Sequence, residues 1–310
     1  MLPPGLEYIV KKAMETTVDG FIEVVDQAAR IFQGEDGAIG RLSILGKHVK
    51  IEPSGEAVII SDLHGDLESL VQILQQSGIL QRMREHENTL LIFLGDYGDR
   101  GEFSAEVYYT VLQLKLQYPA QIVLMRGNHE GPSDILASPH DLPTQFHARF
   151  GKRWESAYSK IIGLFPCFYN SVSVEKRYLM VHGGLPERAR TINDFAYAHE
   201  THPRQTFFEE LLWSDPLESF QGVYPSPRGA GKLFGKDITD KVLEALDVQI
   251  LIRGHEPCSD GFQLNHEGKV LTLFSRKGEP YYNAQGAYLD VSLSDTFEDA
   301  KQLVPYVHKF

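Results

Sequence analysis

The sequence predicts an α/β fold whose strands deliver polar side chains to one shared functional site. Five apolar runs typical of buried strands each end at glycine-flanked His, Asp or Asn residues: "LLIFLGDYGDRG", "AVIISDLHGD", "QIVLMRGNHE", "YLMVHGG" and "VQILIRGHE". Gly and Asp are common in turns, so a single ending of this kind has a structural explanation. Turn chemistry alone does not favour metal-binding side chains at five strand ends. The repeated ending therefore indicates a site, and helical patterns between the first three runs indicate the fold class.

Composition and charge limit the kinds of function. The chain has 310 residues, of which 42% are hydrophobic and 23% charged, as in a globular protein. Its net charge of -12 argues against nonspecific nucleic-acid binding, because that binding depends on clustered Lys and Arg. Cys167 and Cys258 suggest neither a disulfide framework nor a thiolate zinc site. No apolar run approaches the roughly 18 residues of a membrane span. We expect a cytoplasmic protein with neither a nucleic-acid nor a membrane partner.

The N-terminal region is predicted to be a separate segment that precedes the domain with the polar strand ends. Apolar residues spaced by three and four indicate two amphipathic helices before residue 34. The Gly-containing stretch "GEDGAIGRLSILGKHVKIEPSGE" follows and is typical of a hairpin that serves packing and connection. We therefore expect a helical segment and connector over residues 1–48 and a catalytic domain over residues 49–310.

The next elements are expected to form parallel strands. The helical patterns "DLESLVQILQQSGIL" and "SAEVYYTVLQLKLQY" separate the first three apolar runs along the chain. Two β-α-β crossovers follow, which place these strands side by side in one sheet. Ligands bind at the carboxyl ends of strands in such sheets, which is where the polar endings lie.

The residue types at the strand ends indicate a metal site. The candidate donors are oxygens and imidazoles without thiolates: Asp62, His64, Asp96, Asn128, His182 and His255. This mixture suits Mn, Fe, Zn or similar divalent ions. Six donors exceed one tetrahedral site, and two ions can share them if Asp96 bridges. Two divalent ions bring four positive charges, of which Asp62, Asp96 and a bridging hydroxide cancel three. The centre stays positive and, with Arg100, can hold a phosphate dianion.

The motifs together carry a family resemblance over about residues 57–290. "SDLHGD", "GDYGDRGE", "RGNHE", "VHGGLP", "LLWSDP", "SPRGAGKLFG" and "RGHEP" resemble, in order and spacing, those of the phosphoprotein phosphatases. These are metal-dependent serine/threonine phosphatases of the calcineurin-like metallophosphoesterase superfamily. The resemblance implies a central β-sandwich of mixed sheets flanked by helices. It also implies two divalent ions, with manganese preferred to iron or zinc, and phosphorylated proteins or peptides as substrates. Regulatory subunits stay unknown.

The resemblance also implies roles for individual residues. Asp62, His64 and Asp96 would bind the first metal. The second metal would be bound by Asp96, Asn128, His182 and His255. His129 would be the general acid, oriented by Asp99, and the phosphate oxygens would be held by Arg100 and Arg228 with help from the Asn128 amide. Phosphomonoesters would be hydrolysed by direct attack of a hydroxide bound to the metal pair, without a covalent intermediate.

Several of these residues have structural alternatives. His129 could be a core histidine satisfied by Asp99, and Arg228 could be a loop arginine without a ligand. Arg126 and Arg253 each precede a ligand-bearing turn. They could form structural ion pairs, or they could contact the metal ligands and hold them in place. Trp213 is expected to serve packing.

The sequence departs from the family pattern in three ways. Where eukaryotic members carry a Ser-Ala-Pro-Asn-Tyr-Cys loop, this chain has "LFSRKGEPYYNAQGA", so either Tyr281 or Tyr282 could take the place of the tyrosine. Gly98 replaces a usual valine, and "RGHEP" replaces an alanine-glutamine version. These changes suggest a prokaryotic or otherwise divergent branch.

Two other functions compete with a protein phosphatase. A nucleotide or dinucleoside polyphosphate hydrolase shares the early motifs, but "LLWSDP" and "SPRGAGKLFG" argue against it. A noncatalytic scaffold of the same fold should have lost ligands, and none is missing.

Overall fold

A computed structural model describes residues 4–310. Its α-helices are α1 (Pro4–Glu15), α2 (Val18–Gly34), α3 (Leu67–Gln76), α4 (Ile79–Glu85), α5 (Ser104–Gln117), α6 (Leu142–Phe150), α7 (Trp154–Leu164), α8 (Ile192–Ala196), α9 (Ala198–Thr201), α10 (Phe207–Trp213) and α11 (Lys236–Ala245). Short 3-10 helices are η1 (Ser133–Ile135), η2 (Gly151–Arg153), η3 (Phe165–Cys167), η4 (His266–Gly268) and η5 (Ala300–Tyr306).

The strands form two large sheets and one small sheet. They are β1 (Gly37–Ile39), β2 (Leu42–Leu45), β3 (His48–Ile51), β4 (Glu56–Ile60), β5 (Thr89–Phe93), β6 (Ile122–Leu124), β7 (Ser171–Val174), β8 (Tyr178–Val181), β9 (Asp215–Pro216), β10 (Val223–Pro225), β11 (Lys232–Phe234), β12 (Ile250–Arg253), β13 (Phe262–Asn265), β14 (Val270–Leu273), β15 (Ala287–Ser292) and β16 (Val307–Lys309). The sheet orders are β16-β15-β4-β5-β6, β1-β2-β3-β7-β8-β12-β14-β13 and β10-β11-β9.

The first large sheet confirms the predicted crossovers. β4 pairs with β5 and β5 with β6, both in parallel, and α3, α4 and α5 lie in the connections. Asp66 begins α3, because its carboxylate accepts a hydrogen bond from the backbone N–H of Ser69 at 2.9 Å. The second aspartate of "SDLHGD" is therefore a helix cap.

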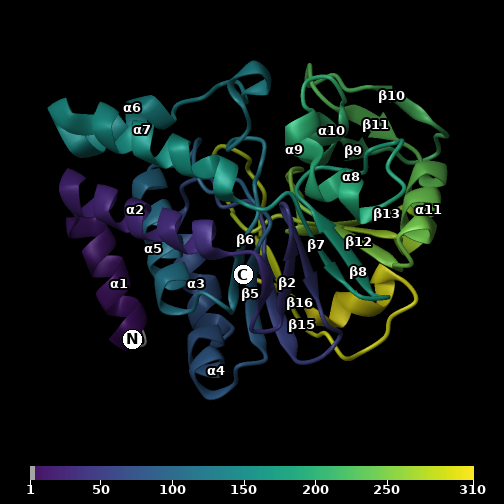
Figure 1. Cartoon of the computed structure of the whole chain (residues 1–310), viewed down its shortest axis with the longest axis horizontal. Helices are drawn as coiled ribbons and strands as arrows, with labels where there is room; N and C mark the ends of the chain where they lie inside the picture. The colour runs from purple at the N-terminus through teal and green to yellow at the C-terminus, as the bar shows by residue number, and fades with distance from the viewer. Residues whose placement is uncertain (1–3) are drawn as a thin grey trace.

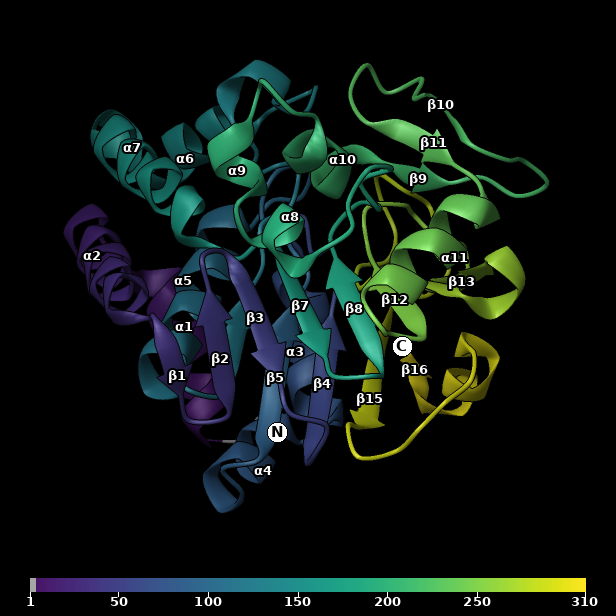
Figure 2. The same cartoon turned by 45° about the vertical axis from the view of Figure 1, so that its right-hand side comes forward.

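The two large sheets enclose one core, as the predicted β-sandwich requires. Figure 2 shows β3 and β7 of one large sheet lying in front of β4 and β5 of the other. One buried cluster includes Val58 and Ile92 from the five-stranded sheet and Val172 and Ile252 from the eight-stranded sheet. The alternate residues of β8 and β12, such as Leu179 and Leu251, face a second cluster with α10 and α11. Both faces of these strands are thus covered, which explains why their sequences are continuously apolar. The predicted fold class is confirmed.

The two predicted N-terminal helices are α1 and α2, which lie beside α5, α6 and α7 (Figure 1). Arg149 of α6 donates hydrogen bonds to the carbonyls of Ala13, Met14 and Thr16, which fixes the end of α1. The predicted hairpin is present and has a third strand, because β1, β2 and β3 pair antiparallel in succession.

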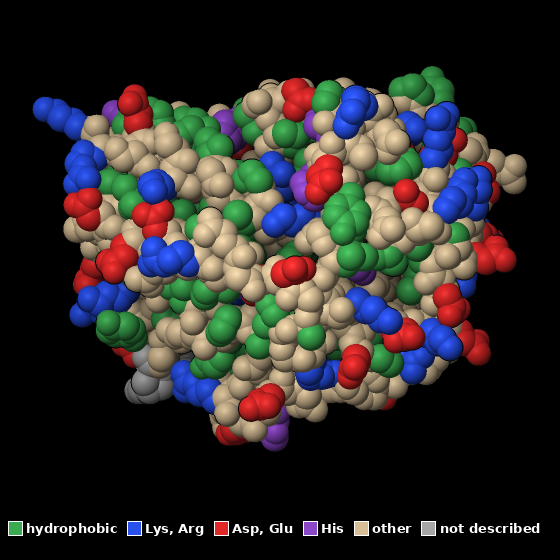
Figure 3. Space-filling model, viewed as in Figure 1, with side chains coloured by type: hydrophobic (Ala, Val, Ile, Leu, Met, Phe, Trp, Pro, Cys, Tyr) green, Lys and Arg blue, Asp and Glu red, His purple; other side chains and the backbone are tan. Residues whose placement is uncertain are grey.

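Two further observations concern the surface and the helices. Acidic and basic side chains are interspersed over the face seen in Figure 3, so the negative net charge forms no single patch on that face. Among residues 4–310, every helix is too short or too polar to cross a lipid bilayer.

Candidate metal centre

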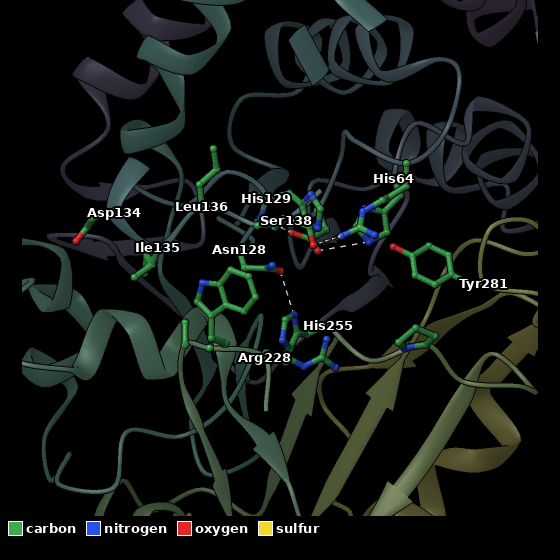
Figure 4. A pocket seen from close by; sticks show the side chains of 17 residues that line it. His64, Asn128, His129, Asp134, Ile135, Leu136, Ser138, Arg228, His255 and Tyr281 are labelled. Atoms are coloured by element: carbon green, nitrogen blue, oxygen red, sulfur yellow. Dashed lines mark hydrogen bonds and ion pairs between the residues drawn. The ribbon is translucent and has the colours of Figure 1, made fainter. Parts of the chain in front are cut away.

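The six predicted donors lie together where strands of both large sheets end. Asp62 and His64 follow β4, Asp96 follows β5 and Asn128 follows β6. The eight-stranded sheet supplies the other two donors, since His182 follows β8 and His255 follows its parallel neighbour β12. Figure 4 shows His64, Asn128 and His255 directed toward the same cavity. The site therefore depends on the closure of the two sheets against each other.

The backbone is constrained at these turns. His64, Asp96 and His255 have φ values of 45°, 58° and 72°, in the left-handed region that residues other than Gly rarely adopt. A Cβ atom on Gly127 would collide with the Asp96 carboxylate, and one on Gly254 would collide with Asp62. Non-Gly residues in strained conformations often mark functional sites, and here the strain lies at the candidate ligands.

Asp96 is the centre of the arrangement. Its Oδ2 atom lies 3.5 Å from His64 Nε2 and 3.4 Å from His182 Nε2. Two groups of donor atoms, each within 4.8 Å of one another, contain Asp96: His64 and His129 complete one, and His182 and His255 complete the other. Asp62 Oδ1 lies 3.8 Å from His64 Nε2, beside the first group. A carboxylate shared by two groups is the geometry that a bridging ligand requires.

The donor chemistry tests whether the residues fit a cation. One terminal atom of the Asn128 amide lies 2.9 Å from His182 Nε2, 3.0 Å from His255 Nδ1 and 3.0 Å from an Asp96 carboxylate oxygen. Among residues 4–310, His255 Nε2 is buried without a hydrogen-bond partner. Carboxylate, amide and imidazole groups that converge in this way are the donor set that divalent metals take. The residues therefore fit a divalent metal.

Electrostatics at the cluster also favour positive charge. Burial, and after it the Asp96 carboxylate, raises the pKa of Asp62. Against the effect of burial, Asp96 raises the pKa of His182 to about 9. Asp62 and His182 thus tend to keep protons beside the ionised Asp96, which is the expected behaviour of a buried acidic site that a cation can occupy.

His129 and Asp99 form a buried hydrogen-bonded pair next to the donors. His129 Nδ1 lies 2.6 Å from Asp99 Oδ2, and both side chains are buried. Although burial acts in the opposite direction, the Asp96 and Asp99 carboxylates raise the pKa of His129. Hydrogen bonds from His129 and from His140 hold the pKa of Asp99 below its usual range, again against burial. The pair is an ionised carboxylate beside an imidazole that readily takes a proton.

Two arginines line the same cavity, whose volume is ≈ 400 Å³. Arg100 donates from an Nη atom to the Ser138 carbonyl at 3.3 Å. Arg228 donates from Nε to Asp215 Oδ2 at 2.6 Å. Within residues 4–310 the terminal nitrogens of Arg228 have no hydrogen-bond partner, so they are free to contact an anion. The structure therefore brings all ten predicted site residues to one place.

Other residues near the cavity answer questions left by the sequence. Tyr281 lines the cavity with its ring 5.3 Å from that of His64, whereas Tyr282 is 78% exposed. Trp213 is buried in the second hydrophobic cluster, as expected for a packing residue, and it also lines the cavity with its ring 5.6 Å from that of His255. Arg253 forms a buried ion pair with Asp215 at 2.8 Å, which is the structural alternative considered for it.

Sequence reasoning missed two supports of the site. Glu130 is fully buried and accepts hydrogen bonds from the backbone N–H groups of Asp96, Tyr97 and Gly127. It thereby ties two ligand-bearing loops together. The position of Glu130 directly after His129 is the sequence feature that could have indicated this role. His140 contacts Asp99, but it follows no strand, so the pattern of strand endings could not find it.

Comparison with known proteins identifies relatives. Residues 57–259 match the family model of the calcineurin-like phosphoesterases. The chain is 34% identical over 260 residues to a probable serine/threonine-protein phosphatase of Encephalitozoon cuniculi, covering 83% of this chain and 54% of that protein. It is 30% identical over 248 residues to a putative serine/threonine-protein phosphatase of Schizosaccharomyces pombe. That match covers 77% of this chain and 78% of the yeast protein. The chain thus spans about half of the first relative's length and about three quarters of the second's.

A solved structure agrees with the fold. A protein serine/threonine phosphatase from Saccharomyces cerevisiae, described as similar to human phosphatase PP5, superimposes with a TM-score of 0.74. The match covers 95% of this chain and 89% of that one at 24% identity. With the family match over most of the motif region, this chain belongs to the calcineurin-like phosphoesterase family, and within it to the serine/threonine phosphoprotein phosphatases.

Proposed function

We propose that this chain hydrolyses phosphoserine and phosphothreonine monoesters in proteins or peptides. The observation that carries the proposal is the sharing of Asp96 by two buried donor groups beside the His129–Asp99 pair. A metal site, a proton donor and two arginines at one cavity are the parts that phosphoryl transfer to water requires. The names of the relatives favour proteins as substrates over nucleotides.

Two divalent ions are proposed for the site, with manganese preferred to iron or zinc, as the family resemblance implies; the carboxylate, amide and imidazole donors suit all three metals. Asp62, His64 and Asp96 would hold the first ion. The second would be held by Asp96, Asn128, His182 and His255. When bound, the ions would supply positive charge for the phosphate and lower the pKa of a water molecule that attacks phosphorus.

The arginines would bind and orient the phosphate. The planar guanidinium groups of Arg100 and Arg228 can each donate two parallel hydrogen bonds to phosphate oxygens. Arg228 is fixed by Asp215, which leaves its terminal nitrogens for the substrate. The NH₂ group of Asn128 would add a donor when the amide oxygen binds the second ion.

His129 would protonate the leaving group. The bond between phosphorus and the seryl oxygen breaks as that oxygen takes the Nε2 proton of His129. Asp99 accepts the hydrogen bond from Nδ1, so it orients the ring and stabilises its protonated form. An alkoxide is a strong base, so this proton matters most for phosphoserine and phosphothreonine.

Parallel assays with a phosphoserine peptide and a dinucleoside tetraphosphate test the proposal. We expect the manganese-loaded chain to show the larger kcat/KM with the peptide. Hydrolysis of the dinucleotide alone would instead support the nucleotide hydrolase, and turnover of neither substrate by metal-loaded protein would support the scaffold.

A further inference from the structure

His140 shares the carboxylate that orients the proposed general acid. Its Nδ1 atom lies 2.8 Å from Asp99 Oδ2, the same oxygen that His129 Nδ1 contacts at 2.6 Å. The other ring nitrogen, Nε2, lies 2.9 Å from the hydroxyl of Tyr158 in α7. His140 lies in the loop between η1 and α6 and does not line the cavity. It therefore contacts Asp99 from the protein interior and not from the cavity.

The hydrogen bonds define the protonation of this chain of residues. Asp99 is an ionised acceptor, so both imidazoles must present an N–H from Nδ1. Burial, and then the charge of Asp99, raises the pKa of Tyr158, so its hydroxyl keeps the proton. The hydroxyl can then donate to His140 Nε2, and this hydrogen bond favours the His140 tautomer with the proton on Nδ1.

The second Asp99 oxygen is fixed as well. Oδ1 accepts hydrogen bonds from the backbone N–H groups of Asp141 at 3.1 Å and Leu142 at 2.6 Å, where α6 begins. These two donors and the two imidazoles fill both oxygens, so the carboxylate has one orientation. Without His140, Oδ2 would keep only His129, and the carboxylate could turn away from the position that aligns that ring.

We propose that His140 is a positioning residue for proton donation, which it controls by holding Asp99 Oδ2 against His129. This inference rests on the proposed function. It assigns a role to Tyr158 too, because the hydroxyl selects the His140 tautomer that donates to Asp99. The effect is confined to steps that need a proton from His129, since His140 contacts none of the proposed metal ligands.

Two amides of similar size separate positioning from packing. In His140→Asn the amide nitrogen can replace Nδ1 and still donate to Asp99. In His140→Gln the amide nitrogen falls near the position of Nε2, so the donor to Asp99 is lost. The matched control is His147→Gln, an exposed histidine on α6. All variants are compared as manganese-loaded protein, with bound metal and kcat measured for a phosphoserine peptide and for nitrophenyl phosphate.

We expect His140→Gln to lower kcat for the phosphoserine peptide about tenfold and for nitrophenyl phosphate much less, the usual size for loss of a supporting contact. His140→Asn should recover most of the loss, and Tyr158→Phe should show a smaller version of it. Equal losses for both substrates, or identical behaviour of the Asn and Gln variants, would overturn the positioning role. A wild-type chain that hydrolyses neither substrate would overturn the proposed function itself.

Discussion

Two networks of buried charged groups differ in whether they border the cavity: the one around Glu35 does not, and the one around Asp96 and Asp99 does. Away from the site, the fully buried Lys115 donates to Glu35 at 2.5 Å and to the carbonyls of Pro119 and Ile122, each at 2.8 Å. Tyr169 donates to the second oxygen of Glu35 at 2.6 Å. The network is complete within the protein, so it needs no ligand.

The network around Asp96 and Asp99 is built from similar groups but is incomplete. Among the described residues, His255 Nε2 is buried without a hydrogen-bond partner, and its nearest carboxylate contact, with Asp215 Oδ1, is 3.8 Å long. The cavity opens beside these atoms. The comparison teaches that buried charge alone does not identify a functional site. An unmatched polar atom at a cavity lined by candidate ligands points to one, because a bound ion can complete it.

The largest expected effect is that of Asp96→Asn. An amide cannot bridge two cations as a carboxylate does, so we expect phosphoserine turnover to fall about 10⁴-fold, or roughly 5 kcal/mol, with loss of bound metal. Asp66→Asn is the matched control, since Asp66 only caps α3 and Asn is an equally good cap. Wild-type turnover and metal content in Asp96→Asn would refute the shared ligand.

His129→Ala should come next and should depend on the leaving group. We expect a loss of about 10³-fold with a phosphoserine peptide, because the alkoxide leaves without a proton. Nitrophenyl phosphate should lose much less, since its leaving group is a weak base. Measuring kcat for both substrates checks this, and equal losses would remove His129 as the proton donor.

Lys115→Met should separate stability from activity. Removing Lys115 leaves the charged Glu35 side chain buried without its cation. We therefore expect the free energy of unfolding, measured in urea, to fall by at least about 3 kcal/mol. Because this network does not reach the cavity, kcat per folded molecule should stay at the wild-type value. A loss of kcat without a loss of stability would mean that the two networks are coupled.

Arg228→Ala should have the smallest of these effects. One charge-assisted contact to phosphate contributes about 2 kcal/mol, so inhibition by inorganic phosphate should weaken roughly 30-fold. Arg228→Lys keeps the charge but cannot donate two parallel hydrogen bonds. Its inhibition by phosphate should therefore be weaker than that of wild type and stronger than that of Arg228→Ala. If phosphate inhibits Arg228→Ala as strongly as wild type, Arg228 is a loop residue held by Asp215 and binds no phosphate.

The parallel strands and the ligand-bearing turns could be predicted from the sequence, because both depend on residues that are close together in the chain. A strand, a turn and a polar residue follow one another within about ten residues, as in the segment that carries Asp96. The parallel order of β4, β5 and β6 follows from the helical patterns between them. The same pattern of strand endings predicted His182 and His255, which lie in the other sheet.

The supports of the site could not be predicted because they depend on tertiary contacts. His140 approaches Asp99 across 41 positions of sequence, and Lys115 approaches Glu35 across 80. No periodicity records such contacts, since they arise only when α6 or α5 packs in place. The choice between Tyr281 and Tyr282 likewise depended on how one loop folds over His64.

Metal stoichiometry measured together with turnover tests the central claim most directly. The chain should be freed of metal, loaded with manganese, and analysed for bound ions per chain while kcat for a phosphoserine peptide is followed. We predict two ions per chain at saturation, turnover that is lost on chelation, and recovery when manganese is returned. Saturation at a single ion, or full turnover by the metal-free chain, would contradict a two-metal phosphatase site centred on Asp96.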